Sequence, residues 1–149
     1  MKKFIGYGSV LALFVMTFFA LQSTAAIQQP PRPVLAFIGA EAVEVGGKQT
    51  MRYHFDVVNK ADFPNDMFAA APDLPPCGAN TKASRTWVDL YEVNGKRLQG
   101  FCALAKPDDL GKLWFALETD VVPPSWVYIE LNDRKTNTKY KSNLAETTL

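Results

Sequence analysis

Two cysteines, Cys77 and Cys102, constrain the fold of this chain more than any other feature of its sequence. Cys77 lies in a proline-rich segment, residues 60–84, whereas Cys102 ends a pattern that predicts a β-hairpin. In an exported chain two cysteines are expected to pair, and this bridge ties the long segment to the hairpin. The sequence has no Cys-x-x-Cys motif and only 1 histidine, which favours a disulfide over a redox or metal site. No metal and no other cofactor is expected.

The N-terminus indicates export. Residues 1–25 have the form of a secretory signal peptide, in which Lys2 and Lys3 precede an apolar run and residues 23–25 provide a small-residue cleavage site. The uncharged run of residues 4–21 is also just long enough for a retained membrane anchor, which is the alternative. We expect a periplasmic or secreted protein with no membrane contact after cleavage.

The size and charge of the mature chain limit its partners. Roughly 125 residues remain after cleavage, enough for one domain with a single core. The formal net charge of +1 falls to −1 when the two lysines of the signal peptide are removed. The mature chain then has no positive net field, so neither nucleic acid nor an anionic membrane surface is expected as a partner.

Alternating apolar and polar residues predict the core-facing sides of three strands. In residues 49–59, Met51, Tyr53, Phe55 and Val57 share one side. The same alternation predicts core positions in two later strands at Leu113, Phe115, Leu117, Val127, Ile129 and Leu131.

The Asn-Gly pair at residues 94–95 predicts the turn of a hairpin within residues 85–104. Two registers fit this hairpin. With a two-residue turn, Trp87 faces Cys102 and packs on the disulfide. With a three-residue loop the register moves by one residue, so Leu90 turns to the core and Trp87 is exposed.

Seven or eight strands separated by turn signals predict an all-β fold, an antiparallel sandwich of two sheets, with a closed barrel as the alternative. The domain is expected to span residues 34–144. It begins with two short strands, residues 34–38 and 41–45, interrupted at Gly39, and the alternative is one edge strand with a bulge there. Residues 60–84 are expected to form a long, compact, disulfide-tethered loop over one end of the core. We expect residues 26–33 to be a disordered lead-in and residues 145–149 a frayed tail.

Three strand patterns support a family resemblance: residues 53–59, residues 87–91, and the final hairpin at 126–131 and 140–143. Together they resemble the immunoglobulin-like or fibronectin type III-like sandwiches of bacterial exported proteins. The cysteines depart from the immunoglobulin pattern, because neither lies in the two strands that this family bridges. The resemblance implies a fold class alone, and no functional residue follows from it.

The sequence contains no catalytic signature, which favours a non-enzymatic module that binds an unknown protein partner or acts as an accessory domain at the cell envelope. Edge strands or the long loop would supply its contact surface. His54 falls on the polar side of its strand between Arg52 and Asp56, and an exposed histidine beside a carboxylate is the simplest interpretation.

Surface aromatic residues make a polysaccharide the alternative partner. Trp114, Trp126 and Tyr128 lie opposite the predicted core positions of their strands, and Trp87 joins them in one hairpin register. Such rings are suited to stacking against sugars, although large aromatic residues also contribute to cores. The candidate ligand-binding residues are Trp87, Asp89, Trp114, Trp126, Tyr128 and Glu130.

Acidic residues suggest two further functions that the sequence favours less. Asp89 and Glu130 are candidates for the paired carboxylates of a small hydrolase. Asp62, Asp66 and Asp73 in the long loop do not have the spacing of a calcium-binding loop, so we interpret them as a solvated turn surface.

Overall fold

The computed structural model describes residues 30–148, and in this part of the chain it contains strands and short 3-10 helices. The predicted signal peptide, residues 1–25, lies outside the described residues. The strands are β1 (Leu35–Val45), β2 (Lys48–Val57), β3 (Thr86–Glu92), β4 (Arg97–Phe101), β5 (Leu113–Glu118), β6 (Trp126–Asp133), β7 (Thr138–Lys141) and β8 (Ala145–Glu146). The 3-10 helices are η1 (Lys60–Asp62), η2 (Asn65–Phe68) and η3 (Pro107–Gly111).

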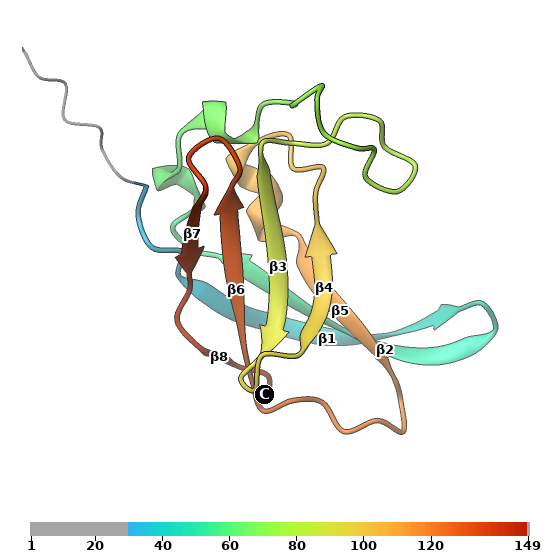
Figure 1. Ribbon diagram of the computed structural model, residues 1–149. Helices are drawn as coiled ribbons and strands as arrows, with labels where there is room; N and C mark the ends of the chain where they lie inside the picture. The colour runs from blue at the N-terminus through green and yellow to red at the C-terminus, as the bar shows by residue number, and fades with distance from the viewer. Residues whose placement is uncertain (1–29, 149) are drawn as a thin grey trace, which may run out of the picture.

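The strands form two antiparallel sheets, which confirms the predicted two-sheet, all-β fold. One sheet has the order β1-β2-β5, and the other has the order β4-β3-β6-β7, with β8 paired to β6 beyond the end of β7. In Figure 1 the five-stranded sheet stands in front, and the three-stranded sheet passes behind it at an angle. The outer faces of the two sheets therefore point to opposite sides of the molecule.

The core lies between the sheets and follows the predicted alternation. The predicted positions that are buried are Tyr53, Phe55, Val57, Leu113, Phe115, Val127, Ile129 and Leu131. Phe55 is at the centre, with its ring centroid 5.5 Å from that of Phe37 and 5.8 Å from that of Phe115. Met51 and Leu117 pack against this cluster but stay partly exposed, because they lie toward the end of the sheet where the β1–β2 hairpin projects from the body.

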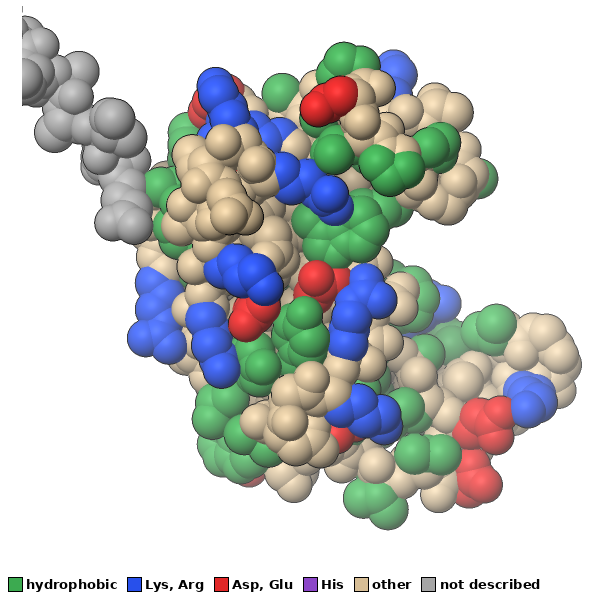
Figure 2. Space-filling model, viewed as in Figure 1, with side chains coloured by type: hydrophobic (Ala, Val, Ile, Leu, Met, Phe, Trp, Pro, Cys, Tyr) green, Lys and Arg blue, Asp and Glu red, His purple; other side chains and the backbone are tan. Residues whose placement is uncertain are grey.

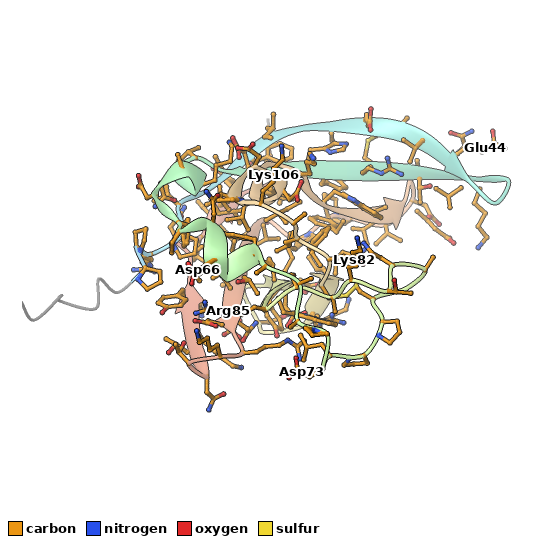
Figure 3. All side chains as sticks on the ribbon, turned by 90° about the horizontal axis from the view of Figure 1, so that it is seen from above. Glu44, Asp66, Asp73, Lys82, Arg85 and Lys106 are labelled. Carbon is orange, nitrogen blue, oxygen red and sulfur yellow. A yellow bond between two sulfur atoms is a disulfide. The ribbon has the colours of Figure 1, made fainter. Side chains whose placement is uncertain are left out.

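The first strand is one continuous edge strand with a bulge, which is the alternative to two short strands. Its register against β2 shifts between Phe37 and Gly39, and Ile38 at this shift is exposed. Beyond the bulge the β1–β2 hairpin extends away from the body, and Figure 3 places Glu44 near its tip.

The β3–β4 hairpin combines features of both predicted registers. The chain turns through a three-residue loop after Glu92, and Gly95 adopts a φ of 88° that favours glycine. An extra residue, Leu98, then shifts the register and restores the pairing expected for a two-residue turn. Leu90 is buried and Trp87 lies on the outer face, so the core side is the one predicted for the three-residue loop.

Residues 60–84 form the expected compact loop. Met67 and Phe68 in η2 are almost fully buried and extend the core at this end of the sandwich. The disulfide joins Cys77 to Cys102, whose Cα atoms are 5.7 Å apart. In Figure 1 the loop crosses the upper end of the five-stranded sheet and continues past β4.

Removing the disulfide is expected to lower the free energy of unfolding by about 3 kcal/mol, because the bridge closes a sequence separation of 25 residues in the unfolded chain. The measurement is urea denaturation of the variant in which Cys77 and Cys102 are both replaced by alanine. Wild-type protein reduced with dithiothreitol should lose a similar amount. Equal stability of the oxidised and reduced wild-type protein would contradict a stabilising role for the bridge.

The described residues at both ends of the domain contact the sheets, whereas residues 26–29 of the expected lead-in and residue 149 of the expected tail lie outside the described residues. Near the C-terminus, β8 places Ala145 in the core, where it pairs with Val127. This pairing arises because β6 begins before the region covered by β7 and so offers free main-chain groups. In the expected lead-in, residues 26–33, the Arg32 side chain donates two hydrogen bonds of 2.9 Å to carbonyl oxygens at and just after the end of β7.

Candidate functional site

The outer face of the five-stranded sheet carries ordered rows of side chains. Alternation along β3, β6 and β7 turns every second residue outward, and strand pairing places these residues side by side. From the end near the long loop, the rows are Trp87 with Asn132 and Lys139, Asp89 with Glu130 and Lys141, and Tyr91 with Tyr128. Figure 2 shows this face, where Lys and Arg side chains surround acidic and hydrophobic ones.

A depression of about 540 Å³ lies on this face, toward the end of the sheet near the long loop. The residues that line it are Trp87, Asp89, Arg97, Asn132, Asp133, Arg134, Asn137, Thr138 and Lys139. Trp87 and Asp89 were predicted as ligand-binding residues. Glu130 is the cross-strand partner of Asp89 but does not line the depression.

Asp89 organises the floor of the depression. Its Oδ1 atom accepts a hydrogen bond of 2.7 Å from the indole Nε1 of Trp87 and another of 2.7 Å from Nε of Arg97. Gly100 lies directly beneath the guanidinium, since a Cβ atom at this position would lie 1.8 Å from Nη2 of Arg97. The Arg97 guanidinium therefore lies against the backbone of β4 and is held in place at the edge of the depression.

Trp87 forms one wall of the depression together with Arg134. The guanidinium carbon of Arg134 lies 4.6 Å from the centroid of the Trp87 ring, which is a cation–π contact. Arg134 belongs to the β6–β7 loop, and its backbone N–H donates a hydrogen bond of 3.3 Å to the carbonyl oxygen of Arg85. The loop thus places a positive charge directly over the indole.

The β6–β7 loop is fixed by a buried ion pair between Arg85 and Asp133. Nε of Arg85 donates to Oδ1 of Asp133 at 2.7 Å, and a second Arg85 nitrogen donates to Asp66 at 3.0 Å. Burial alone would raise the pKa of Asp133, but hydrogen bonds from Arg85, Thr136 and the Lys135 amide outweigh it and hold the pKa below its usual value. Figure 3 shows Arg85 beside Asp66 at this end of the molecule.

Two stacked tyrosines, Tyr91 and Tyr128, lie at the end of the outer face away from the long loop. The rings of Tyr91 and Tyr128 stack with centroids 5.3 Å apart, and Nζ of Lys141 lies 3.8 Å from the Tyr128 centroid. Burial raises the pKa of the Tyr91 phenol, and the carboxylates of Asp89 and Glu130 raise it further. Tyr128 is only 7% exposed, so little of its ring is accessible on this face.

The remaining predicted aromatic residues do not join this site. Trp114 lies on β5 in the other sheet, where Arg52 stacks on its ring at 4.8 Å and Phe101 meets it edge to face. Trp126 is 41% exposed and begins β6, at the end of that strand away from the depression. A single platform built from Trp114, Trp126 and Tyr128 is therefore not formed, because the shared outward phase belongs to strands in two different sheets.

The single histidine is on the far side of the sandwich from the depression. Nε2 of His54 lies 2.9 Å from Oε1 of Glu41, which is also 3.8 Å from Arg52. Its carboxylate neighbour comes from β1 and is not the flanking Asp56. The three groups form a partly exposed charged cluster on the three-stranded sheet.

Three of the acidic residues considered for catalysis and metal binding, Asp89, Glu130 and Asp66, have cationic neighbours. Glu130 lies across the strand from Asp89, and its Oε2 atom is 3.6 Å from Nζ of Lys139. In the long loop, Asp66 is paired with Arg85. Among residues 30–148, no group of three or more His, Cys, Asp or Glu side chains is placed to hold a metal ion.

Three cationic residues of the depression, Arg97, Arg134 and Lys139, were not singled out from the sequence. The alternation of residues along the last strand predicts the outward position of Lys139, since Lys139 and Lys141 are two residues apart and lie on the same side of that strand. The positions of Arg97 and Arg134 depend on the hairpin bulge and on the conformation of a loop, neither of which the sequence pattern specifies.

Comparisons with known proteins assign no family to the chain. No family model matches its sequence, and no curated protein and no solved structure matches it at a significant level. Within residues 30–148, no helix is long and apolar enough to cross a membrane. The disulfide indicates an oxidising compartment outside the cytoplasm.

Proposed function

We propose that this protein is a non-enzymatic binding module of the cell envelope or the secreted space, and that it holds a saccharide in the depression around Trp87. The observation that carries this proposal is an indole ring in a concave surface of about 540 Å³, a size typical of small-ligand sites. Polar groups of several strands converge on the same space.

The chemistry of the depression suits a ligand that has both an apolar ring face and hydroxyl groups. Trp87 supplies an aromatic surface, while Asn132 and Thr138 supply hydrogen-bonding groups along its edge. Asp89 binds its protein partners through Oδ1, which leaves Oδ2 to accept a hydrogen bond from a hydroxyl. Trp87 and Arg97 thus hold the Asp89 carboxylate in one orientation, so a hydroxyl group bound to Oδ2 would also be oriented.

A protein partner is the second candidate, and the free edge of β1 favours it. Among the strands of residues 30–148, β1 pairs only with β2, and Ile38 and Val45 on this strand are 59% and 54% exposed. An extended segment of another protein could add to such an edge through main-chain hydrogen bonds. This surface is separate from the depression, so the two modes of binding do not exclude each other.

We also propose that the sandwich is immunoglobulin-like. In that fold the first, second and fifth strands share a sheet, and the third strand pairs with the sixth, as β1, β2, β5 and β3, β6 do here. β4 lies beside β3, a position that an additional strand takes in the variable-type domains. The disulfide departs from that family, since it ties a loop to the residue that follows β4.

The test is a fluorescence titration of a protein in which Trp87 is the only tryptophan, obtained with Trp114→Phe and Trp126→Phe. The oxidised protein is titrated with neutral and acidic polysaccharides from cell walls and capsules. We expect at least one polysaccharide to shift the Trp87 emission in a saturable way. Calorimetry with Trp87→Ala should then show a loss of affinity of about tenfold or more, because the stacking surface is removed.

Trp126→Ala is the matched control, since it removes an exposed indole away from the depression and should bind as the wild type does. Circular dichroism and thermal melts establish that each variant is folded. If no polysaccharide shifts the emission, or if Trp87→Ala binds as tightly as the wild type, the saccharide proposal is overturned.

A further inference from the structure

Cationic side chains around the Trp87 depression have hydrogen-bond donors that the described residues, 30–148, do not use. Arg97, Arg134 and Lys139 line the depression, whereas the acidic side chains there are Asp89 and Asp133. Asp133 already pairs with Arg85, which lies outside the depression. The depression therefore has a surplus of positive charge, although the whole chain is close to neutral at +1.

Of these three cations, Arg134 is the clearest example of a side chain with unused hydrogen-bond donors. Among the described residues no carboxylate lies within ion-pair distance of its guanidinium, which is held instead by stacking on the Trp87 ring. A stacked guanidinium is fixed in orientation, and its edge presents N–H donors in the plane of the group. That arrangement matches the two oxygens of a carboxylate or sulfate group.

The other two cations are only partly engaged. Arg97 uses Nε for Asp89, and in the described part of the chain its two terminal nitrogens have no carboxylate partner. Nζ of Lys139 lies 3.6 Å from Glu130, too far for a good hydrogen bond. Each can therefore donate to an anionic group in the depression without losing its present contact.

We infer that the ligand of this depression is an anionic saccharide, one that carries carboxylate or sulfate groups. This inference rests on the proposed function and adds the charge of the ligand to it. The sugar ring packs at Trp87, and its acidic group binds to Arg134, with Arg97 and Lys139 on either side. Electrostatic attraction at so exposed a site weakens with ionic strength, so the charged ligand is also expected to bind in a salt-dependent way.

The experiment compares matched ligands that differ in charge. Oligogalacturonate is compared with its methyl ester, and dextran sulfate with dextran, by calorimetry at low and at high sodium chloride. We expect the charged member of at least one pair to bind about tenfold or more tightly than its neutral counterpart. The difference should shrink in high salt. The pair that shows the difference distinguishes carboxylate from sulfate recognition.

Substitutions of cationic residues test whether the preference for the charged ligand arises in the depression. The double variant Arg134→Met with Lys139→Met should lose at least about tenfold in affinity for the charged ligand, and this loss should clearly exceed its loss for the neutral one. Lys48→Met is the control, because Lys48 is an exposed cation in the projecting hairpin that pairs with Glu118. It should bind both ligands as the wild type does.

The outcomes separate this inference from the proposed function. Equal binding of charged and neutral ligands would overturn the charge assignment and leave the saccharide site standing. Absence of binding to all four ligands, with binding of a polyglutamate peptide, would show that the site takes acidic protein segments and would overturn both. Absence of binding to every probe would also overturn both. Equal losses in Lys48→Met and in the double variant would place the charge effect outside the depression.

Discussion

Phe55→Ala is expected to lower the free energy of unfolding by about 3 to 5 kcal/mol, because it removes the ring at the centre of the core. Phe55 is 0% exposed, and its ring packs between Phe37 and Phe115. Both neighbours belong to strands whose hydrogen bonding restricts collapse into the space left by the ring. The measurement is the urea denaturation midpoint, with the slope checked for constancy.

Val58→Ala is the control for this prediction. Val58 follows Phe55 on the same chain segment but is 56% exposed, so its truncation should change stability by no more than about 0.5 kcal/mol. A loss below about 1 kcal/mol for Phe55→Ala would mean that the ring is not part of a close-packed core.

The sequence predicted the core of this protein well because each long strand has one buried side. In β2, β5 and β6, apolar residues recur at every second position, and burial requires only that each strand keep its phase. Phe55, Phe115 and Ile129 all lie between the sheets for this reason. The long loop could be predicted as compact because its apolar residues and its cysteine need partners in the core.

The β3–β4 hairpin shows that the alternation of apolar and polar residues is not enough to predict a register. The loop after Glu92 and the extra residue Leu98 shift the register in opposite directions, so the far end of the hairpin pairs as if neither were present. No sequence pattern marks Leu98 as unpaired, because a leucine suits either side of an edge strand that is only partly covered. The position of Trp87 on the outer face follows from the pairing of β3 with β4 and β6.

The candidate site was predicted only in part because it depends on which strands become neighbours. Trp87 and Asp89 were identified from their own strand. Trp114 has the same outward phase, but β5 joins the opposite sheet, so its ring contacts Arg52 and Phe101 and does not line the depression. Arg134 reaches Trp87 from a loop distant in sequence, and local periodicity says nothing about such a contact.

The same loop links the stability of the fold to the geometry of the site. Arg134, which stacks on Trp87, directly follows Asp133, whose side chain is 1% exposed and pairs with Arg85. Asp133→Ala is expected to cost about 3 to 5 kcal/mol, because it leaves Arg85 largely buried without its main partner. Asp66→Ala removes the other partner of Arg85, but Asp66 is 70% exposed, so its loss should cost less than about 1 kcal/mol.

The contribution of Asp133 should depend on pH in a defined direction. Its pKa is held below the usual value in the folded protein, so its carboxylate stabilises the fold at pH values above the unfolded pKa of about 4. That stabilisation is lost as the pH falls through the lower, folded pKa. Denaturation midpoints of wild type and Asp133→Ala should therefore differ most near pH 7 and converge in acid. A constant difference from pH 7 to pH 2 would mean that Asp133 acts through packing and not through its charge, and the Arg85 pair would then have no role in holding Arg134 over Trp87.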